Sequence, residues 1–252
     1  MPTNCTVIWP REEAGDDIVH WGFMAGKLGA SGSLARPFLI GIRGAAPFDR
    51  QTHQPVSRPS YDDTFVLLTQ GAPPVVFAGA THAYQIDSKE APDVNRDSRP
   101  DVGAIRSGRF LLRDLRTGSY PIFELTLPDG NKRIPAYRDT DHDGVISEDE
   151  MRRAEAARPD PMRPGAEIGS DGYYAVSVLM HTGFDAPPDS AHRSSIACQT
   201  CSLKWLMLLS ATARPASGLI DYVLVDAADL VPFGEERLRN APQSQPADIS
   251  VA

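Results

Sequence analysis

The hydrophobic pattern of this chain consists mostly of short apolar runs separated by turn residues, with few long stretches of helical spacing. The runs at 38–44, 64–68 and 74–78 are each short and bounded by glycine, proline or polar residues. Such runs are typical of buried strands, because helices usually need longer segments. The turn Gln70-Gly71-Ala72-Pro73 separates the last two runs, so residues 64–78 are predicted to form a β-hairpin.

More strands are predicted after a charged, loop-like segment at 87–102. The pair Asp129-Gly130 is a turn signal that separates two of these strands. The apolar segment 173–180 is predicted to be a single strand that runs directly into His181. In chain order, the further predicted strands span residues 108–112, 120–127, 132–137, 173–180 and 220–225.

Two segments have helical character. Residues 148–158 contain no glycine or proline and are rich in Glu, Arg and Ala, so they favour a helix. Pro159 and Pro161 would end that helix. Residues 198–210 contain several leucines and a tryptophan at helical spacing and are predicted to form a second helix.

Together these elements predict a mainly β (α+β) fold, in a single domain with a sandwich- or barrel-like core and two or three helices. We expect residues 36–235 to form this domain. Residues 1–35 carry little periodicity and are expected to be peripheral, and residues 236–252 are expected to form a loose tail.

The charge of the 252-residue chain excludes some classes of partner. Its formal net charge is -8 and its sequence pI is about 5.2. Nucleic acid phosphates and anionic lipids attract basic surfaces, so neither is an expected partner. No apolar run reaches the roughly 18 residues that a membrane span needs. Residues 1–15 lack a basic start followed by an apolar stretch, so no secretory signal peptide is predicted.

The acidic segment 139–150 matches the twelve-position EF-hand-type calcium loop. Alternating aspartates allow their carboxylates to converge on one cation, Gly144 permits the sharp turn, and the last position offers a bidentate glutamate. Hard oxygen donors of this kind select calcium over zinc. The predicted ligands are the side chains of Asp139, Asp141, Asp143, Ser147 (through a water) and Glu150, and the backbone carbonyl of Val145.

The segment that enters this loop, residues 133–138, contains Pro135 and is predicted to be extended rather than helical. A calcium-sensing EF-hand needs an entering helix and a partner loop, and the sequence indicates neither. We therefore expect calcium to stabilise the fold rather than to switch it. The alternative interpretation is a solvated acidic turn without an ion.

A second candidate site combines His181-Thr182-Gly183 with Cys198, seventeen residues further on. A thiolate nucleophile needs an imidazole that accepts its proton. We expect the predicted strand to present His181 at its end and the carbonyl of Thr182 to orient the imidazole. Cys198 is expected to begin the second helix, where backbone N–H groups lower a thiol pKa and stabilise an oxyanion.

These residues resemble the catalytic motif of the L,D-transpeptidase (YkuD-type) family. In that family a strand ends in His-Gly or His-x-Gly, and Ser-x-Gly-Cys follows at about this separation. The resemblance is carried by His181, Gly183, Ser195 and Cys198, whereas Ala197 stands where the family prefers glycine. The Cys-Gln sequence and the aspartate-rich loop before the histidine are closer to a phage- or effector-associated branch. The resemblance is good over 173–203 and looser over 60–226.

The resemblance implies cysteine acyl transfer on peptidoglycan stem peptides. Cys198 would attack the carbonyl that follows meso-diaminopimelate, and the acyl group would pass to an amine or to water. The reaction would be L,D-transpeptidation, exchange or L,D-carboxypeptidase hydrolysis. The implied catalytic residues are Cys198, His181, Thr182, Ser195 and Ala197. Gln199 and Thr200 replace the family arginine, so Arg193, with Gln199, is expected to bind the substrate.

Without a signal peptide, such an enzyme would reach the periplasm or cell wall through a dedicated secretion system or by lysis. Its expected partners are stem peptides, secretion machinery and, for an antibacterial effector, an immunity protein. One alternative is a non-enzymatic, calcium-stabilised binding module of a secreted or phage assembly. Another is a redox pair of Cys198 and Cys201, or a zinc site that adds His181 and His192 to them.

Overall fold

The computed structural model describes seven segments of the chain, the backbone of two short strands at 48–49 and 54–55, and Gly26. The seven segments are residues 35–43, 63–81, 93–115, 120–143, 146–156, 173–182 and 197–226.

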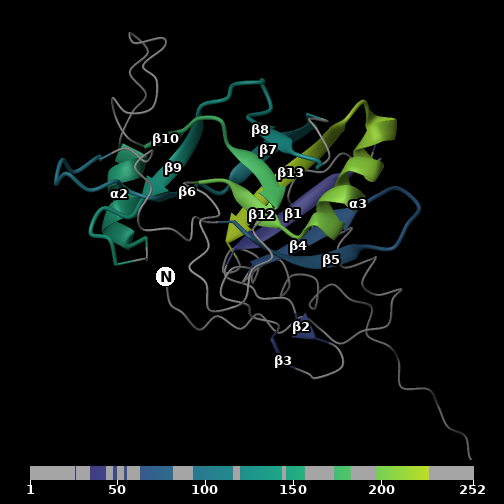
Figure 1. Ribbon diagram of the computed structural model, residues 1–252, viewed down its shortest axis with the longest axis horizontal. Helices are drawn as coiled ribbons and strands as arrows, with labels where there is room; N and C mark the ends of the chain where they lie inside the picture. The colour runs from purple at the N-terminus through teal and green to yellow at the C-terminus, as the bar shows by residue number, and fades with distance from the viewer. Residues whose placement is uncertain are drawn as a thin grey trace, which may run out of the picture.

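Eight strands form a closed barrel, which lies on the right of Figure 1. Two neighbouring pairs are parallel, β1 with β13 and β11 with β12, and the other pairs are antiparallel. The β4–β5 pair is the predicted hairpin. In barrel order the strands are β1 (Phe38–Arg43), β13 (Leu219–Asp226), β7 (Gly108–Asp114), β8 (Phe123–Thr126), β11 (Leu179–Thr182), β12 (Gln199–Cys201), β5 (Val75–Ala80) and β4 (Asp63–Leu68).

Aromatic rings fill the barrel interior, and glycines make room for them. Phe65 stacks on Phe77 with ring centroids 5.5 Å apart. A Cβ atom on Gly79 would lie 2.3 Å from the Phe65 ring, and one on Gly41 would lie 2.5 Å from the Tyr222 hydroxyl. Because atoms cannot approach so closely, glycine is needed on these strands for the rings to pack inside the barrel.

One helix packs against the barrel. Helix α3 (Leu203–Ala213) buries Leu206 and Leu209 in the hydrophobic core, and its Trp205 ring stacks on Phe77 at a centroid distance of 4.9 Å. The short 3-10 helix η1 (Arg214–Ala216) continues α3 and leads into β13. In Figure 1, α3 lies along the right-hand side of the barrel.

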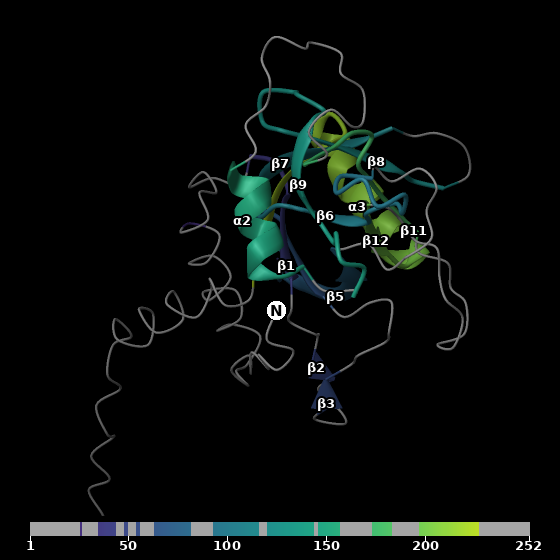
Figure 2. The same ribbon diagram turned by 90° about the vertical axis from the view of Figure 1, so that its left-hand side faces the viewer.

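A smaller sheet lies beside the barrel and carries the acidic loop. It has the strand order β10 (Tyr174–Ala175), β9 (Ile134–Arg138) and β6 (Gly103–Ile105). Helix α2 (Glu148–Ala156) packs against β9, as Figure 2 shows. The extended β9 confirms that a strand, and not a helix, enters the acidic loop. Strands β2 (Phe48–Asp49) and β3 (Gln54–Pro55) pair separately with each other.

The structure confirms the mainly β, barrel-like fold with two described α-helices, and it corrects two predicted elements. Residues 173–180 are not one strand, because Ser177 has a φ of 54° and separates β10 from β11, which belong to different sheets. The helix predicted at 198–210 begins only at Leu203, because residues 199–201 form a strand. Within the described residues, no helix is long and apolar enough to cross a membrane.

Candidate functional site

The predicted nucleophile and base lie on neighbouring parallel strands of the barrel. Strand β11 carries His181, and Cys198 immediately precedes β12. His181 pairs in register with Thr200, so Cys198 lies two residues before the position opposite His181. Such a diagonal offset across a strand pair is within the reach of an imidazole ring. Figure 2 shows β11 and β12 side by side.

Both side chains belong to the outer face of the barrel. Met180 and Cys201 are fully buried in the hydrophobic core. Because side chains alternate along a strand, the residue after Met180 and the residue three before Cys201 point the other way. These residues are His181 and Cys198, and both are partly exposed. The fold therefore brings a thiol and an imidazole to one accessible face.

The orientation of His181 is set by the next residue. Its Nδ1 lies 2.8 Å from the carbonyl oxygen of Thr182, which is the contact expected from the sequence. With the proton on Nδ1, the ring donates to this carbonyl and leaves the lone pair of Nε2 as an acceptor. A general base that accepts a thiol proton needs this tautomer.

The thiol of Cys198 has a backbone donor that was not predicted. The N–H of Leu179 donates a hydrogen bond to Cys198 Sγ at 3.3 Å. The predicted helix N-terminus at Cys198 is wrong, because α3 begins at Leu203 with Ser202 as its N-cap. A hydrogen bond donated to sulfur favours the thiolate over the thiol. Leu179 therefore supplies a contact of the kind that the helix was expected to provide.

The two described cysteines differ sharply in their surroundings. Both are thiols rather than disulfide partners. Cys201 is 0% exposed and lies in the core, and burial raises the pKa of its thiol far above the usual range. Cys198 is partly exposed on the opposite face of the strand. A disulfide between them would require one side chain to cross the sheet, so the redox-pair alternative does not fit this geometry.

Gln199 lies in the barrel interior, where the structure argues against its predicted role in substrate binding. Its side chain is fully buried. The Tyr222 hydroxyl donates to Gln199 Oε1 at 2.8 Å, and Gln199 Nε2 donates to the Thr81 carbonyl at 3.1 Å. Since both ends of the amide are engaged by protein groups, Gln199 stabilises the strand next to Cys198 and does not face a substrate.

The residues next to the cysteine add two observations. Ala197 is buried in the core and is not among the described residues with positive φ, so this position does not require glycine. Thr200 faces His181 in register, and its buried Oγ1 has no hydrogen-bond partner among the described residues. Nothing in the sequence distinguishes Thr200 from an ordinary strand threonine.

Several residues of the predicted sites lie outside the described part, namely Gly144, Val145, Gly183, His192, Arg193 and Ser195.

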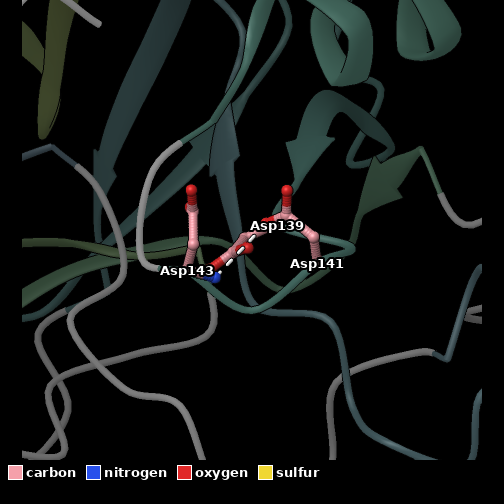
Figure 3. A group of neighbouring side chains, drawn as sticks. All are labelled: Asp139, Asp141 and Asp143. Carbon is pink, nitrogen blue, oxygen red and sulfur yellow. Dashed lines mark hydrogen bonds between the residues drawn. The ribbon is translucent and has the colours of Figure 1, made fainter.

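The predicted calcium loop brings three aspartates together. Asp139, Asp141 and Asp143 each contribute a carboxylate oxygen to a group whose members lie within 4.8 Å of one another (Figure 3). Asp139 is only 2% exposed, whereas the other two are exposed. The N–H of Asp143 donates to Asp141 Oδ1 at 3.3 Å, which holds the two side chains on the same turn.

The structure does not bring Glu150 into this cluster, although the glutamate lies in the first turn of α2 as predicted. Its buried carboxylate accepts four hydrogen bonds, from the N–H and hydroxyl groups of Thr140 and Ser147, at 2.5 to 2.9 Å. Burial alone would raise the pKa of Glu150, but these hydrogen bonds outweigh it and lower the pKa. The Glu150 carboxylate therefore joins Thr140 and Ser147, two residues of its own loop, through hydrogen bonds.

A second acidic loop, which the sequence does not indicate, lies against the first. Residues 93–101 precede β6, and the β6–β9 pairing brings their end beside the start of the first loop. Asp139 donates its N–H to the Val102 carbonyl at 3.0 Å. Asn95 Nδ2 donates to the Thr140 carbonyl at 2.6 Å. From the sequence this segment is predicted only to be part of a charged loop, although its alternating Asp and Asn residues are visible there.

Comparison of the chain with protein-family models, with curated proteins and with solved structures gives no match.

Proposed function

We propose that this protein is a cysteine acyltransferase or peptidase that acts on peptidoglycan stem peptides through Cys198 and His181. One observation carries the proposal: two neighbouring parallel strands present this thiol and this imidazole on the same partly exposed face. The Thr182 carbonyl orients the imidazole, and the Leu179 N–H is directed at the sulfur. These are the parts that an activated cysteine nucleophile requires.

The proposed reaction begins when Nε2 of His181 accepts the thiol proton of Cys198. The sulfur attacks the carbonyl carbon of the scissile amide and forms a tetrahedral intermediate with a negatively charged oxygen. When the carbon–nitrogen bond breaks, the leaving amine takes the proton from the imidazolium, and a thioester to Cys198 remains. An incoming amine or water then attacks the thioester and gives its proton to His181. The carbon–sulfur bond breaks, and the departing thiolate of Cys198 takes that proton back as the thiol. Positioned proton transfer of this kind contributes roughly a hundredfold to ten-thousandfold in rate.

The substrate class rests on the resemblance to L,D-transpeptidases at His181 and Cys198. Stem peptides lie outside the cytoplasm, so the proposal includes delivery to the periplasm or cell wall by a secretion system or by lysis. An antibacterial effector and a phage-associated enzyme both fit this route. An effector would also need an immunity protein in the cell that produces it.

Incubation with tetrapeptide muropeptides tests this function. The wild-type protein should give products whose masses show loss or exchange of the terminal D-alanine, and a thioester adduct on the peptide that contains Cys198. The Cys198→Ala variant should give neither, whereas the matched Cys201→Ala variant should retain both. Turnover by Cys198→Ala would contradict the mechanism. A folded wild-type protein that forms no adduct would favour the non-enzymatic alternative.

We further propose that loop 139–150 binds one calcium ion. The convergence of Asp139, Asp141 and Asp143 supports the proposal, because three carboxylates in a group this tight repel one another without a cation. For Glu150 to complete the shell as the twelfth ligand, its carboxylate would have to exchange its hydrogen bonds with Thr140 and Ser147 for the ion.

A further inference from the structure

The second acidic loop repeats the spacing of calcium-loop ligands. Asp93, Asn95 and Asp97 occupy alternate positions, as Asp139, Asp141 and Asp143 do in the first loop. Numbered from Asp93, these are the first, third and fifth positions, the Arg99 carbonyl is at the seventh, and Asp101 is at the ninth. Oxygen donors at these positions surround calcium in EF-hand-type loops. The loop has no glutamate at the twelfth position, because the chain has already entered β6.

The backbones of the two loops also correspond. Arg96 and Ser98, at the fourth and sixth positions, have φ values of 64° and 71°. His142, at the fourth position of the first loop, has a φ of 63°. Asp93 accepts hydrogen bonds from the N–H groups of Asp97 and Ser98 at 3.1 and 2.9 Å. Turns of this kind also form without an ion, so the backbone alone does not establish a site.

Asp101 supplies an independent observation. Its side chain is 0% exposed, and its Oδ2 accepts the Val94 N–H at 2.5 Å. Its Oδ1 has no hydrogen-bond partner among the described residues, and the approach of His142 Nε2 to 3.5 Å is too long for a strong hydrogen bond. A buried carboxylate oxygen without a partner is unfavourable, because it has lost its hydrogen bonds with water.

The orphan oxygen of Asp101 shares a neighbour with one carboxylate oxygen of Asp97. The same His142 Nε2 atom lies 3.5 Å from Asp101 Oδ1 and 3.2 Å from Asp97 Oδ2. Both oxygens therefore approach a common point, which a neighbouring imidazole now contacts. A hard divalent cation would satisfy both oxygens more fully than one ring nitrogen can, because it accepts six to eight oxygen ligands.

We propose that residues 93–101 form a second calcium site, with Asp93, Asn95, Asp97, the Arg99 carbonyl and Asp101 as oxygen donors, docked against the loop at 139–150. This assignment is independent of the acyl-transfer function. It is also separable from the first calcium site, since the two loops share no proposed ligand. The hydrogen bond from Asn95 to the Thr140 carbonyl joins the two sites directly.

Equilibrium dialysis against calcium chloride, with bound ion measured per folded chain, tests the proposal. The wild-type chain should bind two ions. Asp97→Asn should bind one, and its side chain is 38% exposed, so the substitution should leave the fold intact. The double variant Asp139→Asn, Asp141→Asn should also bind one. Asp129→Asn, an exposed aspartate in the turn before Asn131, is the matched control and should bind two.

Two results would overturn the second site. One is a wild-type stoichiometry of one ion that Asp97→Asn leaves unchanged, which would mean that the second loop is an acidic cluster without an ion. The other is complete loss of binding in the double variant at 139 and 141, with its fold retained by circular dichroism. If instead Asp97→Asn removes one ion and the double variant at 139 and 141 removes none, only the first site fails.

Discussion

The backbone N–H of Leu179 donates a hydrogen bond to the sulfur of Cys198, 3.3 Å away across the β11–β12 pair. This contact ties the candidate nucleophile to the strand that carries His181. The thiol therefore lies in a polar, partly exposed environment, whereas Cys201, three residues further on, lies in the core. Because of this difference in exposure, the two thiols should differ in their reactivity.

We predict that iodoacetamide at neutral pH modifies Cys198 rapidly and leaves Cys201 unmodified until the protein unfolds. Thiolate is the reactive form, and burial keeps Cys201 protonated and inaccessible. Peptide mass spectrometry over a time course distinguishes the two sites, and the same experiment in urea gives the unfolded reference. Equal labelling of Cys201 in the folded protein would contradict the arrangement of the two strand faces.

A second prediction concerns the proposed base. His181→Ala should slow formation of the Cys198 adduct on tetrapeptide muropeptides by about a hundredfold or more, because the thiol loses its proton acceptor. The side chain is partly exposed, so the melting temperature should change little. The pH profile of adduct formation should also lose its dependence on an imidazole and follow the thiol alone.

The matched control for this substitution is Met207→Ala, which removes an exposed side chain from α3 and should leave the rate unchanged. A His181→Ala variant with the wild-type rate and pH profile would show that another group accepts the proton.

The sequence predicts most strands, because each is a short apolar run bounded by turn residues. It does not predict which strands pair. The parallel β1–β13 contact joins residues 38–43 to residues 221–226, and no local pattern specifies such a distant partner. Ser177 shows a second cause of error, because an ordinary polar residue adopts a φ of 54° and divides an apolar segment between two sheets. Tertiary packing determines both features.

In the candidate sites, too, local sequence patterns predict some features, whereas tertiary packing determines others. The spacing from Asp139 to Asp143 predicts convergence of carboxylates, because alternate positions of one tight turn must lie close together. The helix predicted at 198–210 starts too early, because its apolar spacing begins only at Leu203 and residues 199–201 instead pair with β5 and β11. The sequence does not predict a calcium loop at 93–101, because Ser98 stands where such a loop has glycine and no glutamate closes the motif.

Burial of Cys201 leads to a prediction about alkaline pH. Its thiol pKa is raised in the folded state from a usual value of 9.0, so the folded protein retains a proton that the unfolded chain releases. The free energy of unfolding should therefore fall as the pH rises above about 9. Urea unfolding at pH 8 and pH 10 measures this loss, and Cys201→Ala should show a smaller loss than the wild type. An identical loss in both proteins would assign the effect to other groups, such as the buried Tyr222 hydroxyl.

Glu150→Gln should destabilise the calcium-free protein. The carboxylate accepts hydrogen bonds from Thr140 on one oxygen and from Ser147 on the other. A glutamine side chain would replace one of these oxygens by an NH2 group, which cannot accept the hydrogen bonds donated on that side. Leaving a buried donor without an acceptor is unfavourable by about 1–3 kcal/mol. Urea unfolding in the presence of a chelator measures the change, and Glu155→Gln at the end of α2 is the control. An unchanged unfolding midpoint would mean that the loop does not depend on this contact.

The last prediction is that calcium acts on stability rather than on chemistry. The acidic loops adjoin β6 and β9 of the small sheet, whereas His181 lies on barrel strand β11 and Cys198 directly precedes barrel strand β12. An ion that binds only the folded state stabilises it by about 2.7 kcal/mol per site at a hundredfold excess over its dissociation constant. Chelation should therefore lower the melting temperature, and Asp141→Asn should reduce the shift. At a temperature well below both transitions, acyl transfer should continue after chelation. Loss of activity with an unchanged melting curve would show instead that calcium takes part in the reaction.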